Sequence, residues 1–194
     1  MPTVSIDWLD WSWNDCLMNQ GWLICAAALS VPHILYAFVW LFTSDFVSIC
    51  KQLKVVPCDF MAKAGVSIKL WQYAWISYWH ITNGPMFTLT NQTYLRLAIG
   101  LTLVAIGQIL NIAVYKTLGK DGVYYGAKLG RPVPWVNGFP FNTVRDPQYT
   151  GCILTIWGGF ILVATQSHVV AGLIPMGIIW TFYYIASIII ENHF

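Results

Sequence analysis

Charged side chains are scarce in this sequence. They make up 9% of the 194 residues, whereas hydrophobic residues make up 57%. Soluble domains carry roughly 25% charged residues, so this chain has too few of them to cover a surface that faces water. We therefore predict an integral membrane protein in which residues 1–194 form a single domain.

Metal-binding and disulfide patterns are also missing. The five cysteines show neither a C-x-x-C pair nor a paired metal spacing, so we expect no metal site and no disulfide framework. Residues 1–20 lack Lys and Arg, which argues against a signal peptide. They carry three Trp and three Asp instead, and this mixture indicates a segment at the membrane interface.

Long apolar runs are what the sequence has in abundance. Each run predicts a membrane-crossing helix, although the fourth run is short for a full crossing. The last two runs are separated only by residues 165–168 and so predict a helical hairpin. We therefore expect an all-α, polytopic membrane helical bundle of about five spans. The runs are Gly21–Thr43, about Ser67–Ile81, Tyr94–Tyr115, Cys152–Ala164 and Val169–Ile190.

The basic residues indicate the orientation of the spans. Seven of the ten lie in two segments, residues 44–67 and residues 117–150. Basic loops stay in the cytosol, so both segments are predicted to face it. Five crossings then place Glu191, the one glutamate of the chain, on the same face as the cytosolic-face loop 117–151.

The loop 117–151 contains the groups that suggest a ligand. Its prolines prevent a continuous helix, and its four basic residues suit an anionic partner such as a lipid phosphate. Tyrosines and a tryptophan in the same segment suit a cation. The glycines Gly122, Gly126 and Gly130 recur every four residues, which is typical of close helix packing, and they do not form a dinucleotide-binding fingerprint.

Polar residues inside the third span suggest a wall of the same site. Gln108, Asn111 and Tyr115 are spaced three and four residues apart, so they share one helical face. Two interpretations carry about equal weight: hydrogen bonds between helices, or the wall of a ligand pocket.

Part of the sequence resembles a known family of enzymes. The residues from about 105 to 151 are similar to the phospholipid N-methyltransferases, with the strongest likeness to plant and algal members. The string Arg-x-Pro-x-Tyr-x-Gly also resembles the wider group of isoprenylcysteine carboxyl methyltransferases. The matching segments are Gly107-Gln108-Ile109-Leu110-Asn111, Gly122-Val123-Tyr124-Tyr125-Gly126, Pro134-Trp135-Val136, Phe139-Pro140-Phe141 and Arg145-Asp146-Pro147-Gln148-Tyr149-Thr150-Gly151.

The resemblance implies S-adenosyl-L-methionine as the methyl donor and a methylated phosphoethanolamine lipid in the bilayer as the acceptor. The family's Gly-x-Gly cofactor motif falls here on Ala105-Ile106-Gly107, and its Glu-Glu motif falls on Glu191-Asn192. The two departures from the family pattern are Ala105 and Asn192. We further assign to the cofactor site Gly122, Gly126, Pro147 and Gly151.

Two further groups of residues follow from the same reasoning. The catalytic candidates are Arg145, Asp146, Tyr149 and Glu191, with Asp146 or Glu191 taking the proton of the lipid amine. The lipid-binding candidates are Gln108, Asn111, Tyr125, Lys128, Arg131 and Arg145. We expect a phospholipid and not a nucleic acid as the partner, and the endoplasmic reticulum as the membrane.

Two other functions stay open from the sequence. A sterol-type NADPH reductase of similar membrane architecture would use the basic loop for the 2′-phosphate of the cofactor. A non-enzymatic lipid-binding membrane protein is the second alternative. A homo-oligomer is possible, and the sequence does not decide it.

Overall fold

The computed structural model describes residues 5–86 and 93–193, and within these ranges it contains eight helices and no strand. The predicted all-α fold is confirmed. The helices are α1 (Trp13–Met18), α2 (Gln20–Leu41), α3 (Thr43–Gln52), α4 (Pro57–Asn83), α5 (Tyr94–Val123), α6 (Pro147–Val163), α7 (Gln166–Val170) and α8 (Leu173–His193).

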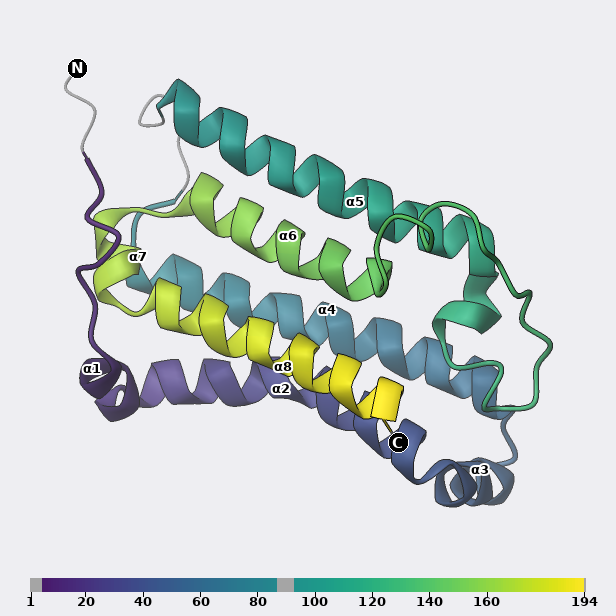
Figure 1. The fold of residues 1–194 in the computed structure, drawn as a ribbon. Coiled ribbons are helices and arrows are strands. Elements are labelled where there is room, and N and C mark those ends of the chain that lie inside the picture. The colour runs from purple at the N-terminus through teal and green to yellow at the C-terminus, as the bar shows by residue number, and fades with distance from the viewer. Residues whose placement is uncertain (1–4, 87–92, 194) are drawn as a thin grey trace.

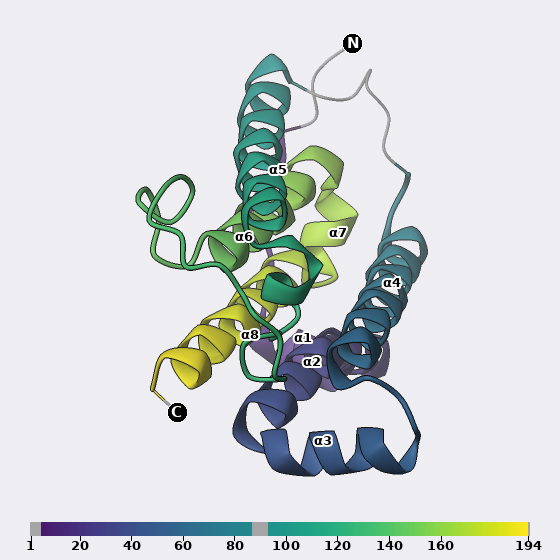
Figure 2. The same ribbon diagram turned by 90° about the vertical axis from the view of Figure 1, so that its right-hand side faces the viewer.

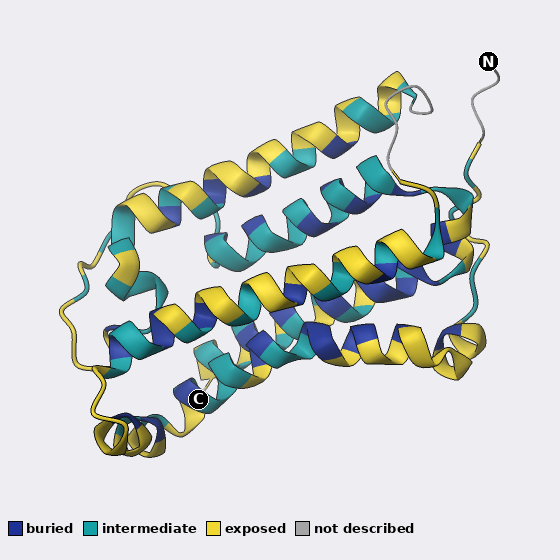
Figure 3. Ribbon diagram, turned by 180° about the vertical axis from the view of Figure 1, so that it is seen from behind, coloured by how far each residue is buried: buried dark blue, intermediate teal, exposed yellow. Residues whose placement is uncertain are grey.

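Five long helices run side by side along one axis of the molecule: α2, α4, α5, α6 and α8 (Figure 1). Of the described helices, α2, α5 and α8 are long and apolar enough to cross a membrane by themselves, and α6 is a shorter apolar helix of 17 residues. Their outer faces carry many exposed residues, drawn in yellow in Figure 3 for the side turned away in Figure 1, and many of the exposed residues are large and apolar. This arrangement confirms the predicted helical membrane bundle.

Helices extend further than the apolar runs that predicted them. Most of the segment 44–67 is helical, because it contains most of α3 and the beginning of α4. Likewise α5 continues to Val123 across a kink at Gly119, whose φ of +67° is a left-handed value that glycine adopts readily. Hydropathy locates the membrane-depth part of a helix, whereas backbone hydrogen bonding continues into polar residues beyond it.

Helices α5 and α6 pack closely through two pairs of glycines. A Cβ added at Gly107 would lie 2.5 Å from the Gly151 carbonyl oxygen, and one added at Gly158 would lie 2.7 Å from the Gly100 carbonyl oxygen. The two glycines of α5 are seven residues apart, and so are the two glycines of α6. The two contacts therefore lie about two helical turns apart along the same side of each helix. Small residues permit this kind of contact between membrane helices.

The two ends of the bundle have different contents. The N-terminal segment, α1 and α7 lie at one end, where the Trp22 indole N–H donates to the Gly172 carbonyl oxygen at 3.0 Å. The other end holds α3, the loop between α5 and α6, and the end of α8 (Figures 1 and 2). Glu191 therefore lies at the same end as the two basic segments, which is the arrangement that the charge pattern predicted.

Candidate active site

The Glu191 carboxylate is the centre of a hydrogen-bonded cluster. The hydroxyls of Tyr125 and Tyr149 both donate to its Oε1 atom, and the two hydroxyl oxygens are 3.3 Å apart. Its Oε2 atom has no hydrogen-bond partner within residues 5–86 and 93–193. One oxygen of the carboxylate is thus fixed by the protein, while the other is available to a ligand.

Local backbone geometry delivers the two tyrosines to Glu191. Tyr125 has a φ of +60°, a left-handed conformation that is rare for an aromatic residue and that concentrates at functional sites. The turn that follows it is held by the Gly126 amide, which donates to the Asp121 carbonyl oxygen at 2.7 Å. Tyr149 lies in the first turn of α6, which begins at Pro147, a residue type suited to the first helical position.

Tyr125 remains a hydrogen-bond donor across the physiological pH range. Burial raises the pKa of its phenol well above the usual value, and the negative charge of Glu191 raises that pKa further. The phenol therefore keeps its proton and donates it to the carboxylate. Two aromatic rings from α2 hold it in place, with centroids 6.1 Å (Tyr36) and 5.4 Å (Trp40) from the Tyr125 ring.

A cavity of about 270 Å³ opens beside this cluster. Its volume is close to the lower end of the range for ligand pockets in proteins. Aromatic rings from α2 and the loop form much of its wall, and basic and acidic residues complete it. The functional side chains that line it are Tyr36, Trp40, Tyr124, Tyr125, Lys128, Arg145, Asp146, Tyr149 and Glu191.

Polar and charged groups line this cavity. The indole N–H of Trp40 is buried and has no acceptor within the described residues. The Lys128 ammonium lies 3.7 Å from the centroid of the Trp40 ring and donates to the Trp40 carbonyl oxygen at 3.2 Å. Neither Arg145 nor Asp146 forms an ion pair in the described part of the chain. These groups can therefore meet a ligand of either charge.

The structure brings together at the Glu191 cavity eight of the seventeen residues that the sequence assigned to the site. In addition to the cluster around Glu191, Gly122 and Pro147 line the same cavity. Gly126 is buried in the turn behind Tyr125, where an added Cβ would meet the Asp121 carbonyl oxygen at 2.5 Å.

Other assigned residues lie elsewhere. Arg131 is exposed, with a guanidinium nitrogen 3.7 Å from the carboxylate of Asp59, and does not line the Glu191 cavity. Asn192 is exposed and donates to the Ile188 carbonyl oxygen at 2.9 Å.

The Ala105-Ile106-Gly107 motif lies on two faces of α5. Ala105 and Ile106 are exposed on the outer face of the helix, whereas Gly107 is buried against Gly151 of α6. In this structure the two glycines set the distance between α5 and α6, and neither lines the cavity beside Glu191. Any contribution that they make to that cavity acts through the position of α6, which carries Tyr149.

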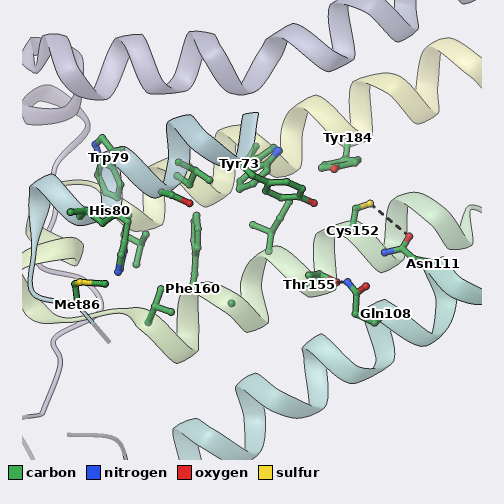
Figure 4. A pocket seen from close by; sticks show the side chains of 18 residues that line it. Tyr73, Trp79, His80, Met86, Gln108, Asn111, Cys152, Thr155, Phe160 and Tyr184 are labelled. Atoms are coloured by element: carbon green, nitrogen blue, oxygen red, sulfur yellow. Dashed lines mark hydrogen bonds between the residues drawn. The ribbon is translucent and has the colours of Figure 1, made fainter. Parts of the chain in front are cut away.

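Gln108 and Asn111 line a second cavity of about 420 Å³, deeper in the bundle (Figure 4). The Gln108 side-chain amide donates to Thr155 Oγ1 at 2.9 Å, and the thiol of Cys152 approaches Asn111 Oδ1 at 3.8 Å. The same side chains therefore contact α6 and line a cavity, and their role as the wall of a ligand pocket stays a prediction.

Sequence reasoning missed the contribution of α2. Tyr36 and Trp40 are four residues apart at the end of the first apolar run, so they share one helical face. That spacing was a usable signal, since aromatic residues on one face near a membrane surface suit a cation. Nothing in the sequence showed that this face packs on Tyr125.

Comparison with known proteins agrees with the geometry. Residues 95–194 match the family described as "Phospholipid methyltransferase". The chain is 31% identical over 134 residues to "Phosphatidyl-N-methylethanolamine N-methyltransferase" of Arabidopsis thaliana, which is 69% of this chain and 75% of that protein.

More distant relatives share shorter segments. The chain is 35% identical over 91 residues to "Phosphatidylethanolamine N-methyltransferase A" of Dictyostelium discoideum, covering 46% of this chain and 41% of that protein. It is 31% identical over 99 residues to "Phosphatidyl-N-methylethanolamine N-methyltransferase" of Saccharomyces cerevisiae, covering 50% and 45%. The chain thus spans less than half of these two relatives.

No solved structure matches the chain. The family match covers more than half of the sequence and includes α5, the loop with Tyr125, α6 and α8. These are the elements that build the cluster around Glu191. The resemblance found in the sequence is confirmed: the chain belongs to the phospholipid methyltransferase family.

Proposed function

We propose that this enzyme transfers methyl groups from S-adenosyl-L-methionine to mono- and dimethyl-phosphatidylethanolamine, towards phosphatidylcholine. The observation that carries the proposal is the Glu191 carboxylate. It has one oxygen held by two tyrosines and one oxygen open to a cavity with aromatic and basic walls. Membership of the phospholipid methyltransferase family, with relatives named for methylating this lipid class, supports the same reaction.

The residues present fit S-adenosyl-L-methionine. When bound, this cofactor would supply an electrophilic methyl group on a sulfonium, whose carbon–sulfur bond breaks as the bond to the lipid nitrogen forms, with the neutral thioether as leaving group. The rings of Tyr36, Tyr125 and Tyr149 offer π faces to a cation. Glu191 Oε2 is free to accept hydrogen bonds from hydroxyl or amino groups. The buried Trp40 N–H and the Lys128 ammonium are available to a carboxylate.

The protein's part in the chemistry is to position the amine, remove its proton and exclude water. An amine attacks only in its neutral form, so a carboxylate must take a proton from it. Asp146 lines the cavity and is free of ion pairs within the described residues, which makes it the first candidate. Glu191 is the second candidate, although two phenol donors already stabilise its charge.

One of the two cations at the cavity serves the lipid phosphate. Arg145 is exposed and lines the cavity, and a guanidinium can bind phosphate through two parallel hydrogen bonds. Lys128 lines the same cavity and lies over the Trp40 ring. We assign the phosphate to Arg145, because this leaves Lys128 and Trp40 for the cofactor.

The direct test measures transfer of labelled methyl groups to monomethyl- and dimethyl-phosphatidylethanolamine in membranes that contain the protein. Transfer to neither lipid by folded protein would refute the proposed function. Glu191→Gln and Arg145→Ala should each lower the rate by about tenfold or more, the effect of losing a charge-assisted hydrogen bond. Asp45→Asn and Lys51→Ala neutralise charges in α3, outside the cavity, and should leave the rate unchanged.

The role of each acid is separable. Asp146→Asn should lower the rate with little effect on binding of S-adenosylhomocysteine, whereas Glu191→Gln should weaken that binding. The reverse pattern would exchange the two roles. Thermal stabilisation by S-adenosylhomocysteine and not by NADPH distinguishes the methyltransferase from the reductase alternative, and stabilisation by neither would favour a non-enzymatic protein.

We also propose that the enzyme resides in the endoplasmic reticulum membrane, with Glu191 on the cytosolic face. The gathering of basic residues at the Glu191 end of the bundle supports this orientation. A single cysteine introduced at Asn192 in a cysteine-free variant should react with a membrane-impermeant thiol reagent added to the cytosolic side of sealed microsomes. Reaction only after the membrane is opened would invert the topology.

A further inference from the structure

The 420 Å³ cavity is the larger of the two described above, and it lies within the helical bundle. Side chains of α4 and α6 face each other across it, with α8 behind and α5 at one edge (Figure 4). Its volume is within the ~300–1,000 Å³ range of ligand pockets. None of the residues that line it belongs to the cluster around Glu191.

The cavity wall changes from polar to apolar along the bundle axis. Towards the Glu191 end it carries Gln108, Asn111, Thr155 and Tyr184, and the Tyr184 hydroxyl accepts a hydrogen bond from the Lys69 ammonium at 2.8 Å. Towards the opposite end it is formed mainly by apolar side chains, including Trp79, Phe160 and Trp180, with His80 as a polar residue among them (Figure 4). A phospholipid has the same gradient, with polar ester groups next to the head group and hydrocarbon beyond them.

Helices α6 and α8 each line both the larger cavity and the Glu191 cavity. On α6, Tyr149 lines the Glu191 cavity, and Cys152, one turn deeper, lines the larger cavity. On α8, Glu191 and Tyr184 are seven residues apart, or about 10 Å along the helix axis. The Tyr149 and Tyr184 rings meet with centroids 6.0 Å apart, so these two side chains form the boundary between the cavities.

The larger cavity opens sideways, between α4 and α5. Tyr73 and Ile81 of α4 both line it and are 51% and 56% exposed, and Gln108 of α5 is exposed at the opposite edge. Helix α4 packs mainly on α2, and Figure 2 shows it standing apart from α5. A bilayer covers this side of a membrane-spanning bundle, so the opening faces lipid.

We propose that this cavity holds the glycerol-ester region and one acyl chain of the acceptor phospholipid, which reaches it laterally between α4 and α5. The inference rests on the proposed function, because it places the lipid amine at Glu191. The polar end hydrogen-bonds the ester oxygens, and the apolar end receives the chain. Fixing the chain at a set distance from Glu191 orients the amine, which is a recognised source of rate enhancement.

Gly159 allows the cavity to be filled without disturbing the fold. It lines the cavity, and a Cβ added there would meet no atom within 4 Å. Gly159→Leu should raise KM for the dioleoyl form of monomethyl-phosphatidylethanolamine by about tenfold or more, the effect of an occupied site. KM for the dihexanoyl form should change little, because its short chains do not reach the apolar end. Thermal stabilisation by S-adenosylhomocysteine should be unchanged.

The control adds bulk on the outside of the bundle. Leu101 is on the outer side of α5 and 56% exposed, so Leu101→Phe should leave both KM values unchanged. An equal change for the long and short acceptors in Gly159→Leu, or no change for either, would overturn the inference. If the wild type methylates neither lipid, that result would instead contradict the proposed function.

A labelling experiment on the unaltered protein provides a second, independent outcome. A monomethyl-phosphatidylethanolamine with a photoreactive diazirine near the end of one chain should label peptides that contain Phe160 and Trp180. Excess unlabelled dioleoyl acceptor should suppress this labelling. Labelling confined to the outer face of α5, without competition, would place the chains in bulk lipid and refute the proposal even if Gly159→Leu fails to fold.

Discussion

Gly107 could act by packing against α6 or by contacting the cofactor, and the two roles predict different effects of Gly107→Ala on stability and on cofactor binding. The added methyl group of Gly107→Ala would lie 2.5 Å from the Gly151 carbonyl oxygen and from Thr155 Oγ1. Relieving such contacts in a packed interface costs about 1–3 kcal/mol. Alanine offsets about 1 kcal/mol of that cost, because it is a better helix former than glycine. The expected net loss of stability is therefore about 0–2 kcal/mol.

Two other glycines of the same helix pair isolate the steric effect. Gly158→Ala introduces the same kind of contact, with the Gly100 carbonyl oxygen at 2.7 Å, about two turns farther from the Glu191 cavity. Gly159→Ala gains the same helix propensity, and its methyl group meets no atom within 4 Å. The difference between Gly158→Ala and Gly159→Ala should thus report the contact alone, about 1–3 kcal/mol.

Thermal unfolding in detergent measures this difference. For a chain of this length 1 kcal/mol shifts Tm by about 2–4 °C, so Gly107→Ala and Gly158→Ala should both unfold roughly 2–12 °C below Gly159→Ala. If Gly107 acts through packing, both variants should lower S-adenosylhomocysteine affinity in proportion to their loss of stability. A Gly107→Ala protein as stable as Gly159→Ala, but unable to bind S-adenosylhomocysteine, would refute the packing argument and give Gly107 a direct cofactor contact.

Three further predictions concern the hydrogen bonds at the two ends of the bundle. Tyr149→Phe leaves Glu191 with one donor, so S-adenosylhomocysteine should bind about tenfold or more weakly by titration calorimetry, and unchanged affinity would remove Tyr149 from the site. Arg96→Ala removes the guanidinium bonds to the carbonyl oxygens of Ile161 and Ala164, and should lower the free energy of unfolding by about 1–3 kcal/mol without changing KM for the lipid. Burial and the charge of Glu191 raise the pKa of Tyr125 in the folded protein above the unfolded-state value of 10. The contribution of the Tyr125 phenol to stability is therefore complete below pH 10 and falls as the pH rises further. Tm measured from pH 9 to 11 should fall more steeply for the wild type than for Tyr125→Phe.

The sequence was a good guide to the long helices and a poor guide to where they end. The apolar run 94–115 predicted the centre of α5, but the helix continues to Val123 because its backbone hydrogen bonds do not depend on apolar side chains. The same effect made most of the segment 44–67 helical, where hydropathy indicated a polar loop. Hydropathy reports which residues face lipid, and a helix that leaves the bilayer loses that signal without unwinding.

The candidate site was partly predictable for a similar reason. Glu191 and the segment that contains Tyr125 and Tyr149 were expected on one face, since the count of crossings and the basic residues both placed them there. Their meeting at one carboxylate oxygen needed the tertiary structure. Arg131 illustrates the limit: a cation in the right loop suits an anionic ligand, but here it faces Asp59, a partner from α4 that lies 72 positions away in sequence.

Helix α6 links the two cavities to the rest of the fold. Pro147 and Tyr149 form part of the Glu191 cavity, Gly151 and Gly158 fix the distance to α5, and Gly159 lines the larger cavity. In the binding mode proposed above, a shift of α6 along its axis would move the boundary between head group and chain relative to Glu191, which is carried by α8. On that proposal the close glycine contacts serve a site that they do not touch, because a looser α5–α6 interface would let the distance from the acyl chain to the amine vary.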